Sequence, residues 1–155
     1  MDVHPAGKVT SLFGGGHFTG RVWLDLLLER GGADGLRMYR VFFEPGSRTH
    51  WHAHPAGQSL MILAGTARSG AEGEPAVEAG PGDVVYTPPG QWHWHGAGPD
   101  GYMIHVAFNP GGKTEWGDDR EVTAEEYEPV SARSGGSSSP PERSIGGQAA
   151  NPPGS

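Results

Sequence analysis

The sequence predicts an all-β fold, either an antiparallel sandwich or a barrel, and three observations favour it. The chain has 155 residues, which suits one domain, and 27 glycines and 14 prolines interrupt it at short intervals. The segments between these turns are apolar or alternating and about five to eight residues long, the length of strands rather than helices. Only one short segment carries helix signals. Many short strands joined by regular turns are typical of antiparallel barrels and sandwiches.

Five strands are expected where apolar or alternating residues lie between turn signals. In chain order they are residues 21–28, 36–44, 58–64, 83–87 and 102–109. A short terminal helix is expected at residues 123–127. Thr123 is followed three residues later by Glu126, the pattern of a capping box, and Pro129 stops the helix.

The last 25 residues differ in composition from the rest of the chain. Sixteen of them are Ser, Gly or Pro, and Ile145 is their one large aliphatic side chain. Such a segment buries too little apolar surface to offset the entropy lost on ordering it. We therefore predict one domain at residues 1–130 and a disordered tail at residues 131–155.

Charge and composition exclude several classes of partner. The formal net charge is −7, from 18 acidic and 11 basic residues, and no Lys/Arg cluster offers phosphates a positive patch, so no nucleic acid is expected. The absence of cysteine excludes disulfides, thiolate metal sites and a cysteine nucleophile. The N-terminus lacks a signal-peptide pattern and the apolar runs are far too short to cross a bilayer. We expect a soluble, unprocessed, cytoplasmic protein without a membrane partner.

Two His-x-His pairs are the strongest chemical signal, His52 with His54 and His93 with His95. Because side chains alternate along a strand, each pair puts two imidazoles on one face, where both can reach one ion. A single pair is a weak signal in a chain with eight histidines, and a strand histidine that only makes structural hydrogen bonds is the alternative. Two pairs that each follow a Pro/Gly turn can converge inside a barrel.

The spacing around both pairs resembles the two motifs of the cupin family. The first runs Gly46, five residues, His52-x-His54, three residues, Gln58, six residues, Gly65; the second runs Gly82, five residues, Pro88-x-Gly90, two residues, His93. The sequence departs from the family pattern at Gln58, where Glu is usual, and at Ala97, where Asn is usual. The resemblance implies a double-stranded β-helix, or jelly-roll barrel, with a divalent metal ion held by His52, His54, Gln58 and His93.

The exchange at Gln58 changes the expected chemistry. Three imidazoles and a carboxylate leave a divalent site with a formal charge of +1, whereas three imidazoles and a neutral amide leave +2. The second site is a harder Lewis acid, which favours non-redox chemistry. Nitrogen and amide-oxygen donors without thiolate suit Mn²⁺, Fe²⁺, Zn²⁺, Ni²⁺ or Cu²⁺, and the donors alone do not select among them.

A narrower resemblance covers residues 18–127. The stretches HPAGQ and GDVVYTPPGQWHWHGA, and a late strand that contains His105, look like the small manganese cupins that include bacterial hydroxynitrile lyases. This resemblance implies Mn²⁺ and a small-molecule substrate, a cyanohydrin whose hydroxyl proton a nearby histidine moves. The candidate catalytic residues are His95 and His105. His50 is expected outside the ligand set, and His17 carries no signal.

Three functions remain open at this point. The first is a metal-dependent lyase using Lewis-acid chemistry, the second a metal-dependent dioxygenase of a small molecule, and the third a non-catalytic small-molecule-binding cupin. The resemblance also implies a homodimer or higher homo-oligomer. Trp51, Trp92 and Trp94 alternate with the histidines and are expected to serve sheet packing or a subunit interface.

Overall fold

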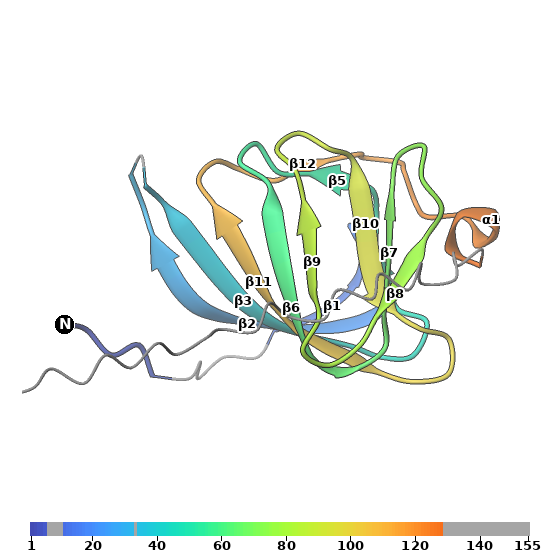
Figure 1. Ribbon diagram of the computed structural model, residues 1–155, viewed down its shortest axis with the longest axis horizontal. Helices are drawn as coiled ribbons and strands as arrows, with labels where there is room; N and C mark the ends of the chain where they lie inside the picture. The colour runs from blue at the N-terminus through green and yellow to red at the C-terminus, as the bar shows by residue number, and fades with distance from the viewer. Residues whose placement is uncertain (6–10, 33, 129–155) are drawn as a thin grey trace, which may run out of the picture.

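Strand pairing gathers the described residues into one antiparallel sheet of 12 strands that curls into a nearly closed barrel (Figure 1). The computed structural model describes residues 1–5, 11–32 and 34–128. The strands are β1 (Ser11–Gly15), β2 (Phe18–Arg30), β3 (Leu36–Phe43), β4 (Arg48–Thr49), β5 (His52–Ala53), β6 (Gln58–Gly65), β7 (Ala67–Ala71), β8 (Val77–Ala79), β9 (Val84–Thr87), β10 (His93–Ala97), β11 (Met103–Pro110) and β12 (Glu115–Trp116).

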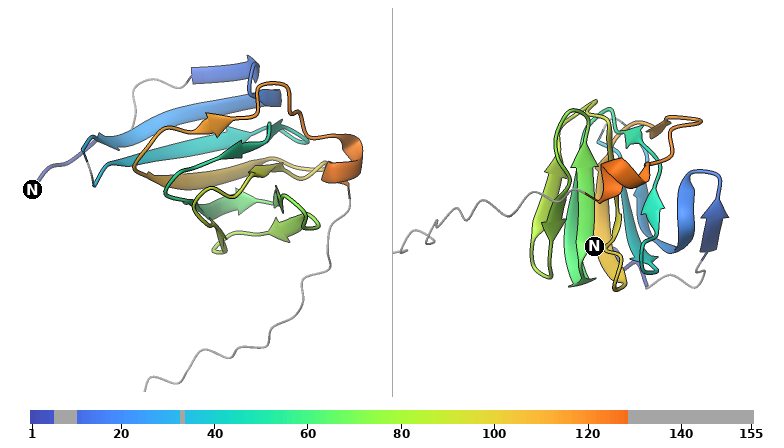
Figure 2. Two further views of the ribbon diagram at one scale, coloured as in Figure 1. Left: turned by 90° about the horizontal axis from the view of Figure 1, so that it is seen from above. Right: turned by 90° about the vertical axis from the view of Figure 1, so that its right-hand side faces the viewer.

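Two facing walls make up the barrel, as the view from above shows (Figure 2). One wall has the order β2-β3-β11-β6-β9, and the other brings β5, β4 and β7 against β10. The long strand β2 joins the walls, because it pairs with β3 along its length and with β4 at Phe18 and Thr19. Every pairing is antiparallel, so short turns suffice to connect most strands.

Strand register places an apolar core at one end of the barrel. Phe43, Met103 and Gly65 are aligned across β3, β11 and β6, and Val22 of β2 lies opposite Phe43. The buried core residues of this end are Val22, Val41, Phe43, Leu60, Ile62, Ala67, Ala79, Ala97, Met103 and Ala107. At the opposite ends of the same strands, the side chains that line a cavity include the polar Gln58 and Asn109 beside the apolar Leu24 and Ala107. The barrel thus has a packed end and an open mouth of mixed polarity.

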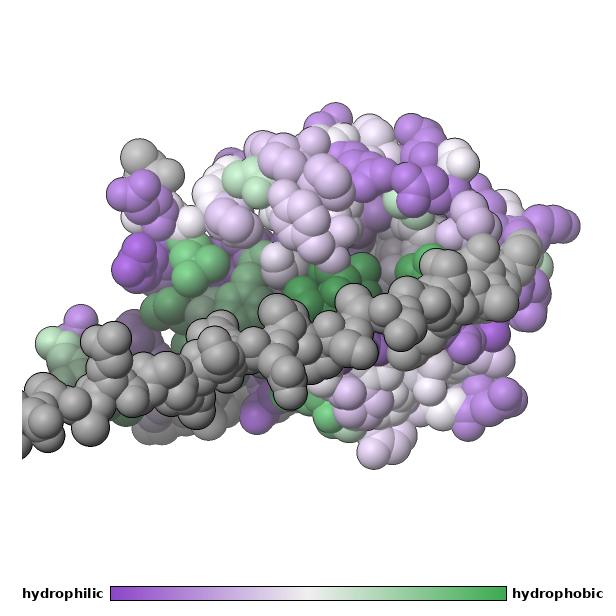
Figure 3. Space-filling view, viewed as in Figure 1, coloured by the Kyte–Doolittle hydropathy of each residue, from purple (hydrophilic) through white to green (hydrophobic). Residues whose placement is uncertain are grey.

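Alternation along β6 explains which side chains enter the core. Leu60 and Ile62 are 1 % exposed, whereas Met61 and Leu63 point outward and are 37 % and 45 % exposed. Val84 and Tyr86 of the neighbouring β9 also remain exposed. The hydrophobic residues of this face show as the green areas in Figure 3. The expected homo-oligomer stays a prediction.

A second apolar cluster lies outside the barrel, under the helix α1 (Ala124–Tyr127). Its members are Trp51, Ala76, Trp94, Val122 and Tyr127, with Trp92 packed against it. Sheet packing is therefore the role of the tryptophans that the structure supports. The helix begins with the expected capping box, in which Thr123 Oγ1 accepts from the Glu126 amide at 3.2 Å and the Glu126 carboxylate accepts from the Thr123 amide at 2.9 Å.

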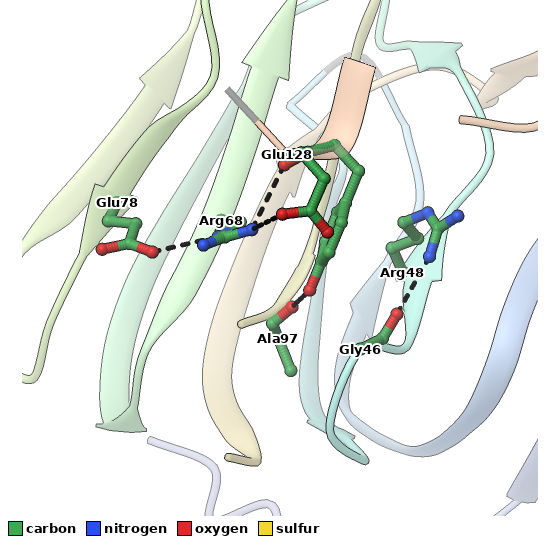
Figure 4. Close-up of polar contacts among 7 residues, drawn as sticks. Gly46, Arg48, Arg68, Glu78, Ala97 and Glu128 are labelled. Carbon is green, nitrogen blue, oxygen red and sulfur yellow. Dashed lines mark hydrogen bonds and ion pairs between the residues drawn. The ribbon is translucent and has the colours of Figure 1, made fainter. Parts of the chain in front are cut away.

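Polar contacts tie α1 to the barrel wall. The Tyr127 hydroxyl donates to the Ala97 carbonyl at 2.7 Å, and the Arg48 and Arg68 guanidinium groups lie 4.7 and 5.0 Å from the Tyr127 ring centre. Arg68 also forms ion pairs with Glu78 and Glu128 (Figure 4). These contacts close the outer side of the wall that carries β10.

The expected all-β architecture with one short terminal helix is confirmed. The five expected strands correspond to β2, β3, β6, β9 and β11. The two-residue strands β4 and β12 have no sequence signature, because pairing partners far along the chain define them. The strand expected at His52-x-His54 is reduced to His52–Ala53 of β5, and His54 lies in the turn that follows. The predicted tail at residues 131–155 lies outside the described residues. Within residues 1–5, 11–32 and 34–128, no helix has the length and apolar character needed to cross a membrane.

Gly65 provides a test of the packed end of the barrel. It has φ +74°, and a Cβ there would collide with the Tyr102 carbonyl oxygen, whereas Gly73 has φ +79° and open space around it. Gly73→Ala should lower the free energy of unfolding by about 1–2 kcal/mol, the cost of a left-handed residue. Gly65→Ala should cost clearly more in urea denaturation, since the backbone must also move. Equal losses in both variants would contradict this packing.

Candidate metal centre

Histidine side chains crowd the mouth of the barrel around a cavity of about 480 Å³. His52 lies on β5, His54 in the turn that follows, and Gln58 at the first position of β6; His93 and His95 lie on β10. The cavity wall includes His52, His54, Gln58 and His95, with Thr49 and Trp116. His93 and His52 lie directly opposite each other in the pairing of β10 with β5. The two sequence motifs therefore meet at one site.

The turns of the two motifs are joined through one carbonyl group. The His54 carbonyl oxygen accepts from the Gly57 amide at 3.1 Å and from the Gly90 amide at 2.9 Å. Both glycines have positive φ, +79° and +73°. A Cβ at Gly57 would lie 2.7 Å from the Thr87 carbonyl oxygen, so the close approach requires glycine as well. This junction holds His54 and Gln58 beside the β10 histidines.

Backbone carbonyls determine which imidazole nitrogen faces the site. His52 Nδ1 lies 2.9 Å from the His50 carbonyl oxygen, and His93 Nδ1 lies 2.9 Å from the Gln91 carbonyl oxygen. Because a carbonyl only accepts, both Nδ1 atoms carry the proton, and both Nε2 atoms keep a lone pair for another partner. The same anchoring of the outer nitrogen is typical of metal-binding histidines.

Gln58 faces His93 in an arrangement that fits a cation. Gln58 Oε1 lies 3.0 Å from His93 Nε2. Burial lowers the pKa of His93, so Nε2 has no proton near neutral pH and two lone-pair atoms face each other. His54 Nε2 is also buried and has no hydrogen-bond partner among the described residues. A divalent ion that accepts from these atoms would satisfy them, and the residues present therefore fit a metal ion.

The tightest group of candidate ligands is His52, His93 and His95. Their nearest nitrogens all lie within 4.8 Å of one another, so this three-histidine group could hold a divalent ion. His54 stands at the rim of the group, with its ring centre 5.2 Å from His52 and 5.7 Å from His93. The structure thus brings the expected set of His52, His54, Gln58 and His93 together. It also adds His95 to the candidate ligands, although the sequence motif had placed His95 outside the ligand set.

His95 of the three-histidine group and His105 form a buried pair. Their ring centres lie 5.1 Å apart, and Phe43 packs against both rings. His95 borders the cavity, whereas His105 is 0 % exposed and absent from the cavity wall. The ring nitrogens of both are buried without a hydrogen-bond partner in the described part of the chain. His105 can therefore act on a cavity ligand only through His95.

Burial keeps the histidines of this site neutral. Desolvation is the main cause in each case, and it lowers the pKa of His52 and His95 well below the ordinary value. It lowers the pKa of His54 to about 4 and that of His105 to about 3. Neutral imidazoles are the form that binds metal ions, and their proximity then carries no mutual charge repulsion.

Several residues of the site carried no usable sequence signal. His17 stacks on Trp116, with ring centres 4.3 Å apart and an interplanar angle of 6°, and Trp116 lies 4.8 Å from the His52 ring. These rings border the cavity from β12 and the β1–β2 turn. Asn109 accepts from Gln58 Nε2 at 2.9 Å. Strand alternation could have found Asn109, because it lies four residues after His105 on the same face of β11.

His50 contributes through its backbone rather than its ring. Its carbonyl oxygen anchors His52, and its amide donates to the His17 carbonyl at 2.8 Å. Its imidazole is buried yet absent from the cavity wall, in keeping with the expected position outside the ligand set.

Known proteins resemble this chain in sequence and in structure. Residues 39–108 match the model of the Cupin domain family. The chain is 42 % identical over 113 residues to the (R)-mandelonitrile lyase of Granulicella tundricola, covering 71 % of this chain and 85 % of that protein. It is 38 % identical over 82 residues to the dimethylsulfoniopropionate lyase DddQ of Ruegeria pomeroyi, covering 51 % of this chain and 41 % of that enzyme. The chain therefore spans less than half of the second lyase.

Solved structures agree with the barrel. A cupin-like protein from Thermotoga maritima superposes with a TM-score of 0.70 at 39 % identity, over 82 % of this chain and 95 % of that one. The dimethylsulfoniopropionate lyase DddQ from Ruegeria pomeroyi superposes with a TM-score of 0.55 at 28 % identity, over 68 % of this chain and 54 % of that one.

His52→Ala should abolish metal binding, because it removes the imidazole at the centre of the three-histidine group. The measurement is the Mn²⁺ content per chain by elemental analysis, after loading and desalting. His50→Ala is the matched control, since it keeps the carbonyl that anchors His52 and should retain the ion. Undiminished metal content in His52→Ala would refute the site.

Acid should destabilise the protein partly through His105. Its folded pKa of about 3 lies below its ordinary value of 6.5, so between these pH values the unfolded chain binds a proton that the folded chain excludes. This contribution to stability is fully present above pH 6.5 and is lost progressively as pH falls towards 3. His105→Leu should reduce the loss of unfolding free energy between pH 7 and pH 4.5 by roughly 2 kcal/mol, measured by urea denaturation. The exposed His4→Leu variant should behave like the parent, and equal pH dependence in His105→Leu would contradict the assignment.

Proposed function

Because the chain belongs to the cupin family, we propose that it is a metal-dependent enzyme that cleaves a small organic molecule, a lyase of the hydroxynitrile type with Mn²⁺ as its ion. The observation that carries the proposal is the convergence of buried neutral imidazoles, His95 among them, and one neutral amide oxygen beside the cavity at the barrel mouth. Similarity to two proteins named as lyases supports the class of reaction.

The donor set suits Lewis-acid chemistry. An ion held by His52, His54, Gln58 and His93 would supply polarisation of a substrate oxygen and stabilisation of an anion such as cyanide. Gln58 contributes no charge, so these four donors leave the full +2 of a divalent ion. That charge favours anion binding and disfavours oxidation of the ion, which supports a lyase over an oxygenase.

The cavity suits a small, largely apolar substrate. Its volume of about 480 Å³ lies within the usual range for ligand pockets of about 300–1,000 Å³. Phe18, Leu24, Val41 and Phe43 form apolar walls that can hold an aromatic or alkyl group.

We assign the proton transfer to His95. Its ring borders the cavity, and burial keeps it unprotonated before reaction. An unprotonated ring nitrogen can accept the hydroxyl proton of a cyanohydrin. The O–H electron pair then forms the carbonyl, the C–CN bond breaks with its pair leaving on cyanide, and His95 returns the proton to give HCN and an aldehyde. Because burial disfavours the charged imidazolium, it favours the return of the proton and opposes its removal to the same extent; polarisation of the substrate oxygen by the ion would assist that removal.

His105 is a positioning residue in this scheme. It lies outside the cavity wall and contacts the His95 ring edge-on, with ring centres 5.1 Å apart, so we assign it a role in packing against His95 rather than in touching substrate. The oxygenase alternative would use the same ligands with dioxygen as a co-substrate. A non-catalytic binding module would use the cavity and the metal site but would need no group that transfers a proton.

Mandelonitrile cleavage tests the function. The Mn²⁺-loaded protein should release benzaldehyde from mandelonitrile under argon, followed by absorbance. His95→Leu should lower the rate by about 10²–10⁴-fold, the usual contribution of an acid–base group, with Mn²⁺ content retained. Loss of Mn²⁺ in that variant would instead make His95 a ligand. Substrate-dependent oxygen uptake, or no cleavage by the loaded protein, would overturn the lyase proposal.

A further inference from the structure

The Gln58 amide has an acceptor oxygen at one end and a donor NH₂ group at the other, and Asn109 contacts the NH₂ end. We infer that Asn109 is a positioning residue that holds the Gln58 amide with its oxygen towards the metal site. The inference rests on the proposed metal site and goes beyond it, because it assigns the orientation of one donor to a residue outside the ligand set.

The contacts of Gln58 divide its amide between two partners. Nε2 donates to Asn109 Oδ1 at 2.9 Å, and Oε1 lies 3.0 Å from His93 Nε2. Gln58 is 4 % exposed, so neither end of the amide can turn to bulk water for another partner. Asn109 enters from β11, which pairs with β6 beside Gln58 through Phe108 and Ser59. The pairing of the two strands therefore sets this contact.

Without Asn109, the Gln58 amide would be more stable if it rotated by half a turn, so that its NH₂ group and its oxygen exchanged places. The His93 proton is on Nδ1, bonded to the Gln91 carbonyl, so Nε2 presents a lone pair to Gln58. A turned amide would donate its N–H to that lone pair, a favourable hydrogen bond in the absence of an ion. The observed orientation instead places two acceptors against each other. The hydrogen bond to Asn109 offsets this repulsion and keeps the oxygen available to a cation.

The consequence is a site prepared for a cation before one arrives. An amide with its NH₂ inward would repel a cation and occupy the His93 lone pair. An ion would then have to turn the amide before binding, and affinity would fall by that cost. Glutamate in place of Gln58 would need no such control, because both its oxygens are acceptors. Asn109 is therefore coupled to the neutral residue that distinguishes this chain from the usual cupin pattern.

A double-mutant cycle on Mn²⁺ affinity tests the inference. The apoproteins are titrated with Mn²⁺, and free Mn²⁺ is read by electron paramagnetic resonance. Asn109→Leu should weaken Mn²⁺ binding by about 10-fold or more, the usual effect of removing a group that orients a ligand. Asn109→Asp keeps an acceptor for Gln58 Nε2 and should bind Mn²⁺ at least as tightly as the parent. In the Gln58→Glu background Asn109→Leu should change affinity by less than about threefold, because the side chain that needed orienting is gone.

Controls separate orientation from folding and from function. Thermal unfolding of each apoprotein establishes that it is folded, and Asn109→Ala serves if the leucine does not fold. Unchanged affinity in the folded Asn109 variant, or an equal loss in the Gln58→Glu background, would overturn the inference while leaving the metal site intact. Failure of the parent and of Gln58→Glu to bind Mn²⁺ would overturn both the inference and the proposed metal function. The experiment measures Mn²⁺ affinity and not lyase activity. A protein that binds Mn²⁺ but does not cleave mandelonitrile would therefore refute the lyase proposal and leave this inference unaffected.

Discussion

Two hydrogen bonds between a histidine ring and the backbone two residues earlier determine the character of the barrel mouth. His52 and His93 each give their Nδ1 proton to such a carbonyl, at 2.9 Å in both cases, and they face each other across paired strands. Because their protons are held on the outside, their Nε2 lone pairs are left for the interior. Burial lowers the pKa of both rings and keeps them neutral. The convergence of lone pairs on one point follows from these bonds.

An arrangement of facing lone pairs is unfavourable without a cation, so other parts of the structure must hold it. The apolar core at the far end of the barrel, centred on Val22, Phe43 and Met103, fixes the strands. The His54 carbonyl ties together the turns at Gly57 and Gly90. Asn109 holds the Gln58 amide from a third strand. The site resembles a set of donors that rigid surroundings keep in place before a ligand binds, which is the arrangement that gives affinity at low cost.

His95 and His105 differ in their contact with the cavity. His95 borders it, while His105 lies wholly within the protein and reaches it only through His95. The ring of His17 stacked on Trp116 covers the other side of the ligand group. A substrate in the cavity would thus meet apolar walls and the histidines, among them His95, to which we assign the proton transfer. This combination supports the proposed lyase function, as does the similarity to two proteins named as lyases.

The sequence by itself determined the all-β architecture, the strands β2, β3, β6, β9 and β11 and the capping box at Thr123, because turn residues, alternation and local side-chain bonds act over a few neighbouring positions. It also indicated His52, His54, Gln58 and His93 as a group, through the spacing of glycine and proline around them. Only the tertiary structure decided the rest. The two-residue strands exist because distant segments pair, and the separation of His95 from His105 depends on how far each lies from the cavity. The contact of Gln58 with Asn109 depends on which strands are neighbours. All three features depend on distances between residues that are far apart in the chain. Strand alternation predicts which face of a strand a side chain occupies, but it does not predict which other strand that face meets.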